Sequence, residues 1–171
     1  LGYIGLPTSA LIAKHGTNVL GVDINQQVVD TINQGKIHIV EPDLDEIVSE
    51  AVSKGFFKAS TKATSAEVYL IVVPTPFKGN HEPDISFVEA ATKGIISLLK
   101  EGDLYIIEST SPIGTTEKMQ QLILMVEHST RLRLHPRLQL PFGRSIVGSK
   151  LYLVAKHNSL DLIHAPQRSS N

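Results

Sequence analysis

Two glycines and one aspartate near the start of the chain have the types and spacing of a dinucleotide-binding site. Residues 1–7 read Leu-Gly-Tyr-Ile-Gly-Leu-Pro, so Gly2 and Gly5 match the second and third glycines of Gly-x-Gly-x-x-Gly. Such glycines let the backbone approach a pyrophosphate, which the amide groups and dipole at a helix N-terminus stabilise. Asp23 follows Gly5 at about the spacing of an acid that binds the adenosine ribose, and its charge favours NAD because it would repel the 2′-phosphate of NADP.

Each of these features also has a simpler interpretation. Ordinary turns contain the same glycine spacing, and Asp23 could be a turn residue or a helix cap. Two loops with hydroxyl groups, residues 74–79 and 108–116, follow predicted strands, and ligands bind at such strand ends in open α/β sheets. Capping a helix is nevertheless the commoner role for threonines such as Thr115 and Thr116.

The elements that must position these residues alternate between strands and helices. Apolar runs at residues 19–23, 68–73 and 104–108 are typical of buried parallel strands. Helical spacing of apolar residues, with caps or breakers at the ends, predicts the intervening helices. These cover residues 3–15 before Gly16, a segment between Asn25 and Gly35, about ten residues after Pro42, residues 87–99, and a segment from Thr115 or Thr116. We therefore predict an α/β fold with a Rossmann-like doubly wound parallel sheet.

The predicted sheet is incomplete, because its first strand is missing. The first glycine of the motif and the strand that should carry it do not occur in residues 1–171. In the usual strand order 3-2-1-4-5-6 that strand is central, so its two neighbours would be left with unpaired edges. Each unsatisfied backbone group would cost about 1–3 kcal/mol. We expect a truncated domain of low stability.

Charge divides the chain near Met119. Residues 1–119 hold nine lysines, no arginine and fifteen acids, whereas residues 120–171 hold five arginines, two lysines and two acids. A basic surface for nucleic acid or acidic lipid is one interpretation. We favour a divergent basic tail of different origin, such as translation in a shifted frame, and expect no nucleic-acid partner. Residues 1–119 are then the NAD-binding domain.

Several classes of chemistry are disfavoured. The chain has no cysteine, which excludes disulfides, thiolate metal sites and cysteine nucleophiles within it. No metal site is predicted, since the histidines of the tail match no compact ligand spacing. No apolar run approaches the roughly 18 residues of a membrane span, and no signal peptide is evident, so we expect a cytoplasmic protein without membrane contact. Residues 145–155 could form a strand, but the sequence does not show whether it joins the sheet. The histidines are His128, His135, His157 and His164.

Six separated segments carry a more specific resemblance. Together they resemble, in order and spacing, the amino-terminal domain of the UDP-glucose/GDP-mannose dehydrogenase family. Within that family they are most similar to the bacterial subgroup that oxidises UDP-N-acetyl-D-mannosamine. The segments are residues 1–7, 22–25, 37–44, 73–79, 81–84 and 108–119.

The resemblance implies a two-step, NAD-dependent oxidation of the sugar 6-hydroxyl to a carboxylate, with a cysteine holding the intermediate aldehyde. By position, Tyr3 and Ile4 would contact the pyrophosphate through their backbone and Asp23 would bind the adenosine ribose. Thr75 and Thr116 match other NAD-contacting positions. Thr110 matches a threonine that helps to place a catalytic water near the nicotinamide.

The chain also departs from the family pattern. Beyond Met119 the family's Cys-Pro-Glu-Arg segment, catalytic lysine and nucleophilic cysteine have no match, so we expect no turnover by this chain alone. A nucleotide-binding remnant without catalysis is the alternative. The 6-phosphogluconate and 3-hydroxyacyl-CoA dehydrogenases share the glycine turn, but the loops after the strands argue against them. The sequence gives no basis for an oligomeric state.

Overall fold

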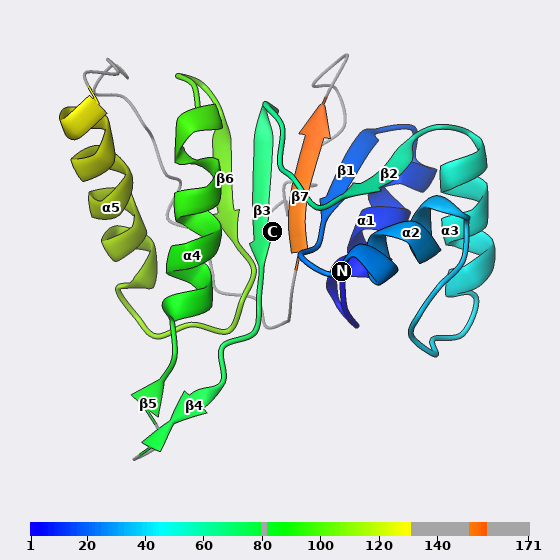
Figure 1. Ribbon diagram of the computed structural model, residues 1–171, viewed down its shortest axis with the longest axis horizontal. Helices are drawn as coiled ribbons and strands as arrows, with labels where there is room; N and C mark the ends of the chain where they lie inside the picture. The colour runs from blue at the N-terminus through cyan, green and yellow to red at the C-terminus, as the bar shows by residue number, and fades with distance from the viewer. Residues whose placement is uncertain (80–81, 131–150, 157–171) are drawn as a thin grey trace, which may run out of the picture.

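A five-stranded sheet forms the centre of the molecule in the computed structural model, which describes residues 1–79, 82–130 and 151–156 (Figure 1). The strand order is β2-β1-β7-β3-β6. β1 pairs in parallel with β2, β3 pairs in parallel with β6, and β7 is antiparallel to both β1 and β3. Four strands therefore run in one direction and β7 alone runs in the other. The strands are β1 (Asn18–Val22), β2 (Phe57–Ser60), β3 (Val68–Val72), β6 (Leu104–Ile107) and β7 (Leu151–Lys156).

β7 corrects the expectation that two strands face each other with unpaired edges. It lies between β1 and β3, and its register sets Leu153 opposite Gly21 on one side and opposite Leu70 on the other. An antiparallel strand from the end of the chain thus supplies backbone partners at the position where a parallel first strand was missing. The sequence suggested a strand here without saying where it pairs; the sheet is mixed as a result.

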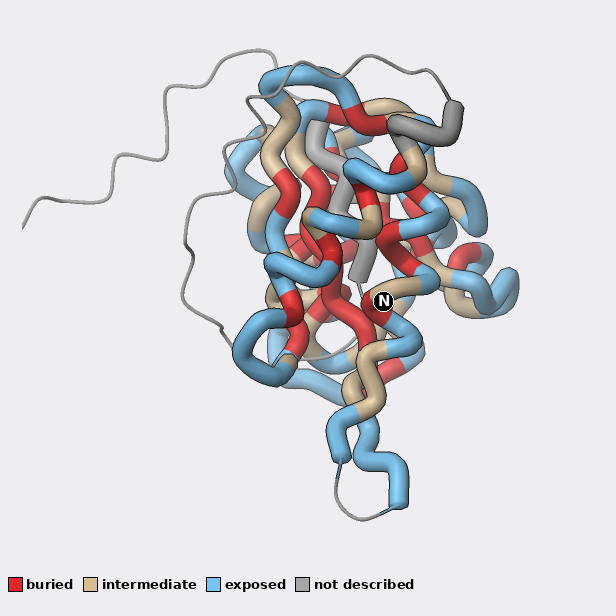
Figure 2. The backbone as a smooth tube through the Cα atoms, turned by 90° about the vertical axis from the view of Figure 1, so that its left-hand side faces the viewer, coloured by how far each residue is buried: buried red, intermediate tan, exposed pale blue. Residues whose placement is uncertain are grey.

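Helices cover both faces of the sheet and divide the core in two. Side chains of β3 alternate between the faces: Leu70 and Val72 belong to the apolar cluster that contains residues of α1, α2 and α3, whereas Tyr69 and Ile71 belong to the cluster of α4 and α5. In Figure 2 the buried segments run through the middle of the molecule, between exposed outer turns. The helices are α1 (Gly5–Lys14), α2 (Gln26–Asn33), α3 (Leu44–Ser53), α4 (Ser86–Ile95, continued by the 3-10 turn η2, Ile96–Leu98) and α5 (Thr115–Thr130).

Local signals in the sequence account for the ends of several helices. The Asn25 side chain accepts a hydrogen bond from the Gln27 backbone N–H and caps α2, as predicted. Gly16 follows α1 with φ +87° and Gly35 follows α2 with φ +71°, the left-handed conformation that favours glycine. These caps confirm the expected α/β alternation.

Two features were not predicted. β2 is an edge strand of only four residues, and a hairpin of β4 (Phe77–Lys78) and β5 (Glu82–Pro83) projects from the loop after β3 (Figure 2). Lys78 Nζ lies 2.8 Å from Asp84 Oδ1 at the base of this hairpin. Hydrogen bonds from Lys78 and Ser86 lower the pKa of Asp84 to about 2. Three of the tail histidines (His135, His157 and His164) lie outside the described residues.

Candidate functional site

The residues predicted to bind a dinucleotide gather at one edge of the sheet. Asp23 follows β1, the loop of residues 74–79 follows β3, and the loop of residues 108–116 follows β6. α1 begins at the same edge, which is the lower edge in Figure 1. Because the carboxyl ends of parallel strands meet at one edge of a sheet, the topology brings together segments far apart in the sequence.

The glycine turn presents free backbone donors at the start of α1. The Leu6 N–H donates to the Gly2 carbonyl oxygen at 3.0 Å, whereas within the described residues no hydrogen bond is made by the N–H groups of Tyr3, Ile4 and Gly5. A Cβ placed on Gly2 would meet no atom within 4 Å, so core packing does not require glycine there. Unpaired N–H groups beside open space at a helix N-terminus fit an anionic phosphate.

Close packing sets this turn against β1. Leu1 is buried in the core, and a Cβ on Gly21 would lie 2.7 Å from a Leu1 methyl carbon. Gly21 therefore leaves the room that Leu1 occupies. The consequence is that the glycine turn lies next to Asp23, two residues beyond Gly21.

Asp23 is partly buried. Its carboxylate forms an ion pair with the amino group of Leu1, and its Oδ1 accepts a hydrogen bond from the Asn25 N–H at 2.9 Å. Asn25, not Asp23, provides the side-chain cap of α2. Asp23 thus stabilises the turn after β1, and its carboxylate lies next to the start of the glycine turn at Leu1.

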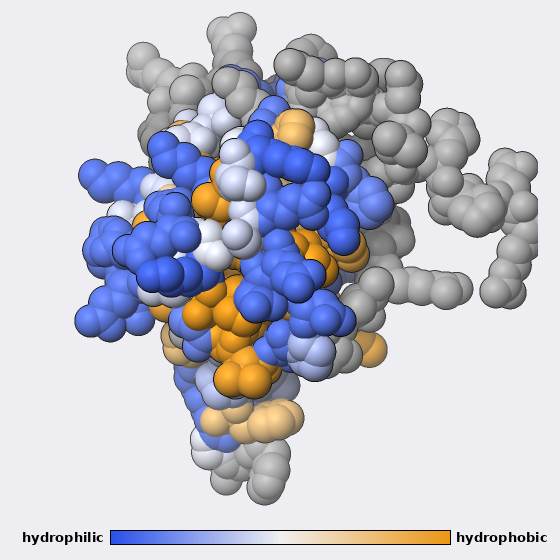
Figure 3. All heavy atoms as spheres, turned by 90° about the vertical axis from the view of Figure 1, so that its right-hand side faces the viewer, coloured by the Kyte–Doolittle hydropathy of each residue, from blue (hydrophilic) through white to orange (hydrophobic). Residues whose placement is uncertain are grey.

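His38 belongs to this neighbourhood, although sequence reasoning assigned it no role. Desolvation lowers the pKa of His38, the charge of the Leu1 amino group acts in the same direction, and the Asp23 carboxylate opposes both. These interactions place the loop between α2 and α3 near Asp23. The nearby apolar side chains of Ile24 and Val40 are 87% and 92% exposed. Figure 3 shows that the face over α2 and α3 is mainly hydrophilic, with apolar side chains gathered toward the lower edge.

The predicted threonines lie in the loops after β3 and β6. Thr75 is half-buried, Thr110 is exposed, and Thr116 is exposed in the first turn of α5. Thr115 is buried, and its hydroxyl donates to the Pro112 carbonyl oxygen at 2.8 Å, which is a local turn contact. This contact is structural but is not the helix cap of the simpler interpretation, which would need the hydroxyl to accept from a backbone N–H. Thr75, Thr110 and Thr116 remain candidates for ligand contact.

Glu108 and Ser109, which precede Thr110, were not predicted individually as site residues. Ser109 is fully buried, and its hydroxyl binds the Val73 backbone at the end of β3. Glu108 has a buried Oε2 without a hydrogen-bond partner in the described part of the chain, and this burial raises the pKa of its carboxyl group. Both follow a predicted strand, but their partners or lack of partners could not be read from the sequence.

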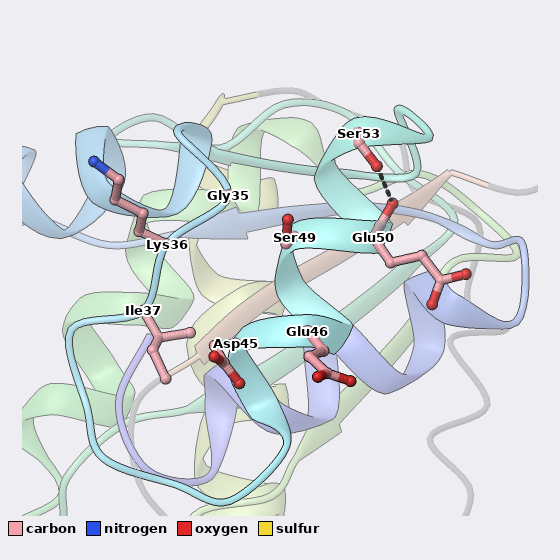
Figure 4. A pocket seen from close by; sticks show the side chains of 8 residues that line it. All are labelled: Gly35, Lys36, Ile37, Asp45, Glu46, Ser49, Glu50 and Ser53. Carbon is pink, nitrogen blue, oxygen red and sulfur yellow. Dashed lines mark hydrogen bonds between the residues drawn. The ribbon is translucent and has the colours of Figure 1, made fainter.

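A hollow of about 650 Å³ lies elsewhere, between α3 and the loop that follows α2 (Figure 4). Lys36 points away from the acidic side chains and donates to Gln34 Oε1 at 3.3 Å. Ser53 donates to the Glu50 backbone oxygen at 2.9 Å, so its hydroxyl is engaged locally. No residue of the predicted dinucleotide site lines this hollow. Its lining residues are Gly35, Lys36, Ile37, Asp45, Glu46, Ser49, Glu50 and Ser53.

In the described residues, no group of three or more His, Asp or Glu side chains could hold a metal ion. None of the helices in that same part of the chain is both long enough and apolar enough to cross a membrane.

Comparisons with known proteins agree with the geometry. The model of the UDP-glucose/GDP-mannose dehydrogenase family, NAD binding domain, matches residues 1–141. A UDP-N-acetyl-D-mannosamine dehydrogenase of Escherichia coli (strain K12) is 60% identical over 121 residues, which cover 71% of this chain and 29% of that protein. An NDP-N-acetyl-D-galactosaminuronic acid dehydrogenase of Ralstonia nicotianae is 57% identical over 119 residues, covering 70% of this chain and 28% of that protein.

A solved structure shows the same likeness in three dimensions. The UDP-N-acetyl-mannosamine dehydrogenase Cap5O from Staphylococcus aureus superimposes with a TM-score of 0.71 and 44% identity, over 74% of this chain and 31% of that one. The chain therefore spans less than a third of the length of these relatives.

Proposed function

Because the chain belongs to the UDP-glucose/GDP-mannose dehydrogenase family and contains its NAD binding domain, we propose that it binds NAD for the oxidation of UDP-N-acetyl-D-mannosamine to the corresponding uronate. The observation that carries the proposal is the meeting of the glycine turn, Asp23 and the threonine loops at one sheet edge. The names of the most similar relatives support the choice of sugar nucleotide. A cytoplasmic location belongs to the same proposal.

The adenosine half of the cofactor would lie over β1 and the start of α1. The free N–H groups of Tyr3, Ile4 and Gly5 would donate to the pyrophosphate, whose charge the α1 dipole stabilises. The Asp23 carboxylate would accept hydrogen bonds from the adenosine ribose hydroxyls and repel a 2′-phosphate. NAD is then the preferred form of the cofactor.

The nicotinamide half would lie over the ends of β3 and β6. Thr75 and Thr116 would contact the cofactor, and Thr110 would hold a water molecule beside the reacting carbon. The nicotinamide supplies the hydride acceptor for the oxidation. The family reaction also needs a thiol to hold the aldehyde, and residues 1–171 contain no cysteine.

The absence of cysteine favours a second candidate for the chain on its own, which is nucleotide binding without turnover. An assay of NADH formation with NAD and UDP-N-acetyl-D-mannosamine separates the two. We expect no NADH from the purified chain, and steady NADH formation would show that these 171 residues are catalytically sufficient.

Replacement of Asp23 tests the cofactor site directly. Titration calorimetry of NAD and NADP should show tighter NAD binding by the wild-type chain, and Asp23→Ala should weaken NAD binding and reduce the preference over NADP. Loss of one charge-assisted hydrogen bond corresponds to about 1.5–3 kcal/mol, or roughly 10-fold to 150-fold in affinity. Asp30→Ala, which removes an exposed acid from α2, is the matched control. Equal NAD affinity in wild type and Asp23→Ala would contradict the proposed role.

A further inference from the structure

One buried hydroxyl joins the ends of β3 and β6. Ser109 Oγ accepts a hydrogen bond from the Val73 backbone N–H at 2.8 Å and donates one to the Val73 carbonyl oxygen at 2.8 Å. A serine hydroxyl can donate one hydrogen bond and accept others. Here it donates to the carbonyl oxygen and accepts from the N–H of the same residue, Val73. Ser109 is fully buried. The contact is therefore a closed clasp between two segments that are 36 residues apart.

The clasp continues the sheet beyond its last regular pair. Ile71 of β3 lies opposite Ile107 of β6, and the Glu108 N–H donates to the Ile71 carbonyl oxygen at 2.9 Å. Beyond this point β6 has ended and the backbone of Val73 has no strand partner on that side. The Ser109 side chain satisfies the Val73 backbone groups in place of the next hydrogen bonds between strands. The segments that follow β3 and β6 are therefore hydrogen-bonded to each other as far as Val73 and Ser109.

Both loops of the proposed nicotinamide half start at this clasp. Val73 is followed by Pro74 and Thr75, and Ser109 is followed directly by Thr110. The ring of Pro74 fixes its own φ and restricts the residue before it, so the position of Val73 is transmitted to Thr75 through few free torsions. The separation of Thr75 and Thr110 thus depends on the Ser109 hydroxyl.

A buried hydroxyl on β6 itself provides a contrast. The Tyr105 hydroxyl lies 2.6 Å from Thr92 Oγ1. Its partner is in α4, within the core, and no loop of the candidate site starts there. Tyr105 and Ser109 therefore both carry a buried, hydrogen-bonded hydroxyl but differ in what they hold in place.

We propose that Ser109 is a positioning residue for the nicotinamide half of the cofactor, because it fixes the two threonine loops relative to each other. The inference rests on the proposed function, since it assumes that NAD lies across this edge. It predicts that loss of the hydroxyl weakens contacts on the nicotinamide side and spares those at Asp23 and the glycine turn.

The test compares NAD with ADP, which has the adenosine and pyrophosphate groups but no nicotinamide. The affinities of both ligands for the full 171-residue chain are measured by titration calorimetry, with far-UV circular dichroism to check folding. We expect Ser109→Ala to weaken NAD binding about tenfold, or about 1.4 kcal/mol, and to change ADP binding by less than about twofold. Tyr105→Phe, the matched control, should change neither affinity, and Ser109→Thr, which keeps the hydroxyl, should restore NAD binding.

Each outcome is decisive. Equal loss of NAD and ADP affinity in Ser109→Ala, or no loss of either, would overturn the positioning role while leaving NAD binding by the wild type intact. Failure of the wild-type chain to bind NAD would instead refute the proposed function, and the positioning role with it. Amide hydrogen exchange gives a reading without ligand: Ser109→Ala should accelerate exchange at Thr75 and Thr110, and Tyr105→Phe should not.

Discussion

The side chain of Asn33 protects the outer edge of the sheet, and its removal should measurably destabilise the fold. β2 is the edge strand beside β1, and Asn33 is the last residue of α2. Asn33 Nδ2 donates to the Ala59 carbonyl oxygen at 3.0 Å, and its Oδ1 accepts from the Ala59 N–H at 2.8 Å. One amide thus satisfies both backbone groups of a buried residue on an edge that is otherwise open to pairing.

The magnitude follows from these two bonds. Each contributes about 0.5–1.5 kcal/mol net, so Asn33→Ala should lose about 1–3 kcal/mol of unfolding free energy. Alanine has a better helix propensity than asparagine, which offsets at most about 0.7 kcal/mol of this loss of unfolding free energy. A net loss near 2 kcal/mol would lower the Tm by about 4–8 °C in a chain of this length.

The assay is urea unfolding followed by circular dichroism, with Gln34→Ala as the control. Gln34 is exposed, and its side-chain oxygen accepts a hydrogen bond from the surface amine of Lys36. Asn33→Asp adds a sharper test, because one carboxylate oxygen would face the Ala59 carbonyl oxygen. That repulsion raises the pKa of the new acid in the folded state, so the variant should be most stable below about pH 4 and lose stability as the pH rises.

An Asn33→Ala variant as stable as Gln34→Ala would contradict the stabilising role of the Asn33 side chain. An Asn33→Asp variant whose stability does not fall between acid and neutral pH would equally show that the amide is not bonded to Ala59 in solution.

Three further predictions concern β7 and two carboxyl groups. Leu153→Pro should destabilise the chain by about 3 kcal/mol or more, because proline removes a backbone N–H from a strand that has a neighbouring strand on each side. Leu153→Val keeps the N–H and should be nearly neutral in urea unfolding. Glu108→Gln should stabilise the chain at pH 7 but not at pH 4, because the raised pKa of Glu108 means that the fold favours its protonated form, an advantage lost as the pH rises through that pKa. The pKa of Asp84, measured by NMR titration, should be about 2 and should rise toward its ordinary value in Lys78→Ala.

The alternating elements could be predicted because their signals are local. The continuous apolar run at β3, the cap at Asn25 and the glycine after α2 each depend on a few neighbouring residues. Parallel topology then placed Asp23 and the threonine loops at one edge without any knowledge of side-chain contacts.

The remaining features depend on distant partners. β2 has only four residues, too few for a periodic pattern to stand out. The position of β7 is decided by the edges of β1 and β3, and even the end of β3 at Val72 lies far before the start of β7 at Leu151 in the sequence. The Ser109 hydroxyl bonds to the backbone of Val73, and every residue has such backbone groups. The sequence therefore does not distinguish Ser109 from the other serines and threonines of this loop.

Titration of the wild-type chain with NAD tests the central claim most directly. We predict saturable binding of one NAD per chain, with competition by ADP and weaker binding of NADP. The absence of NAD binding by a folded chain, established by its circular dichroism, would contradict the assignment of this sheet edge as a cofactor site.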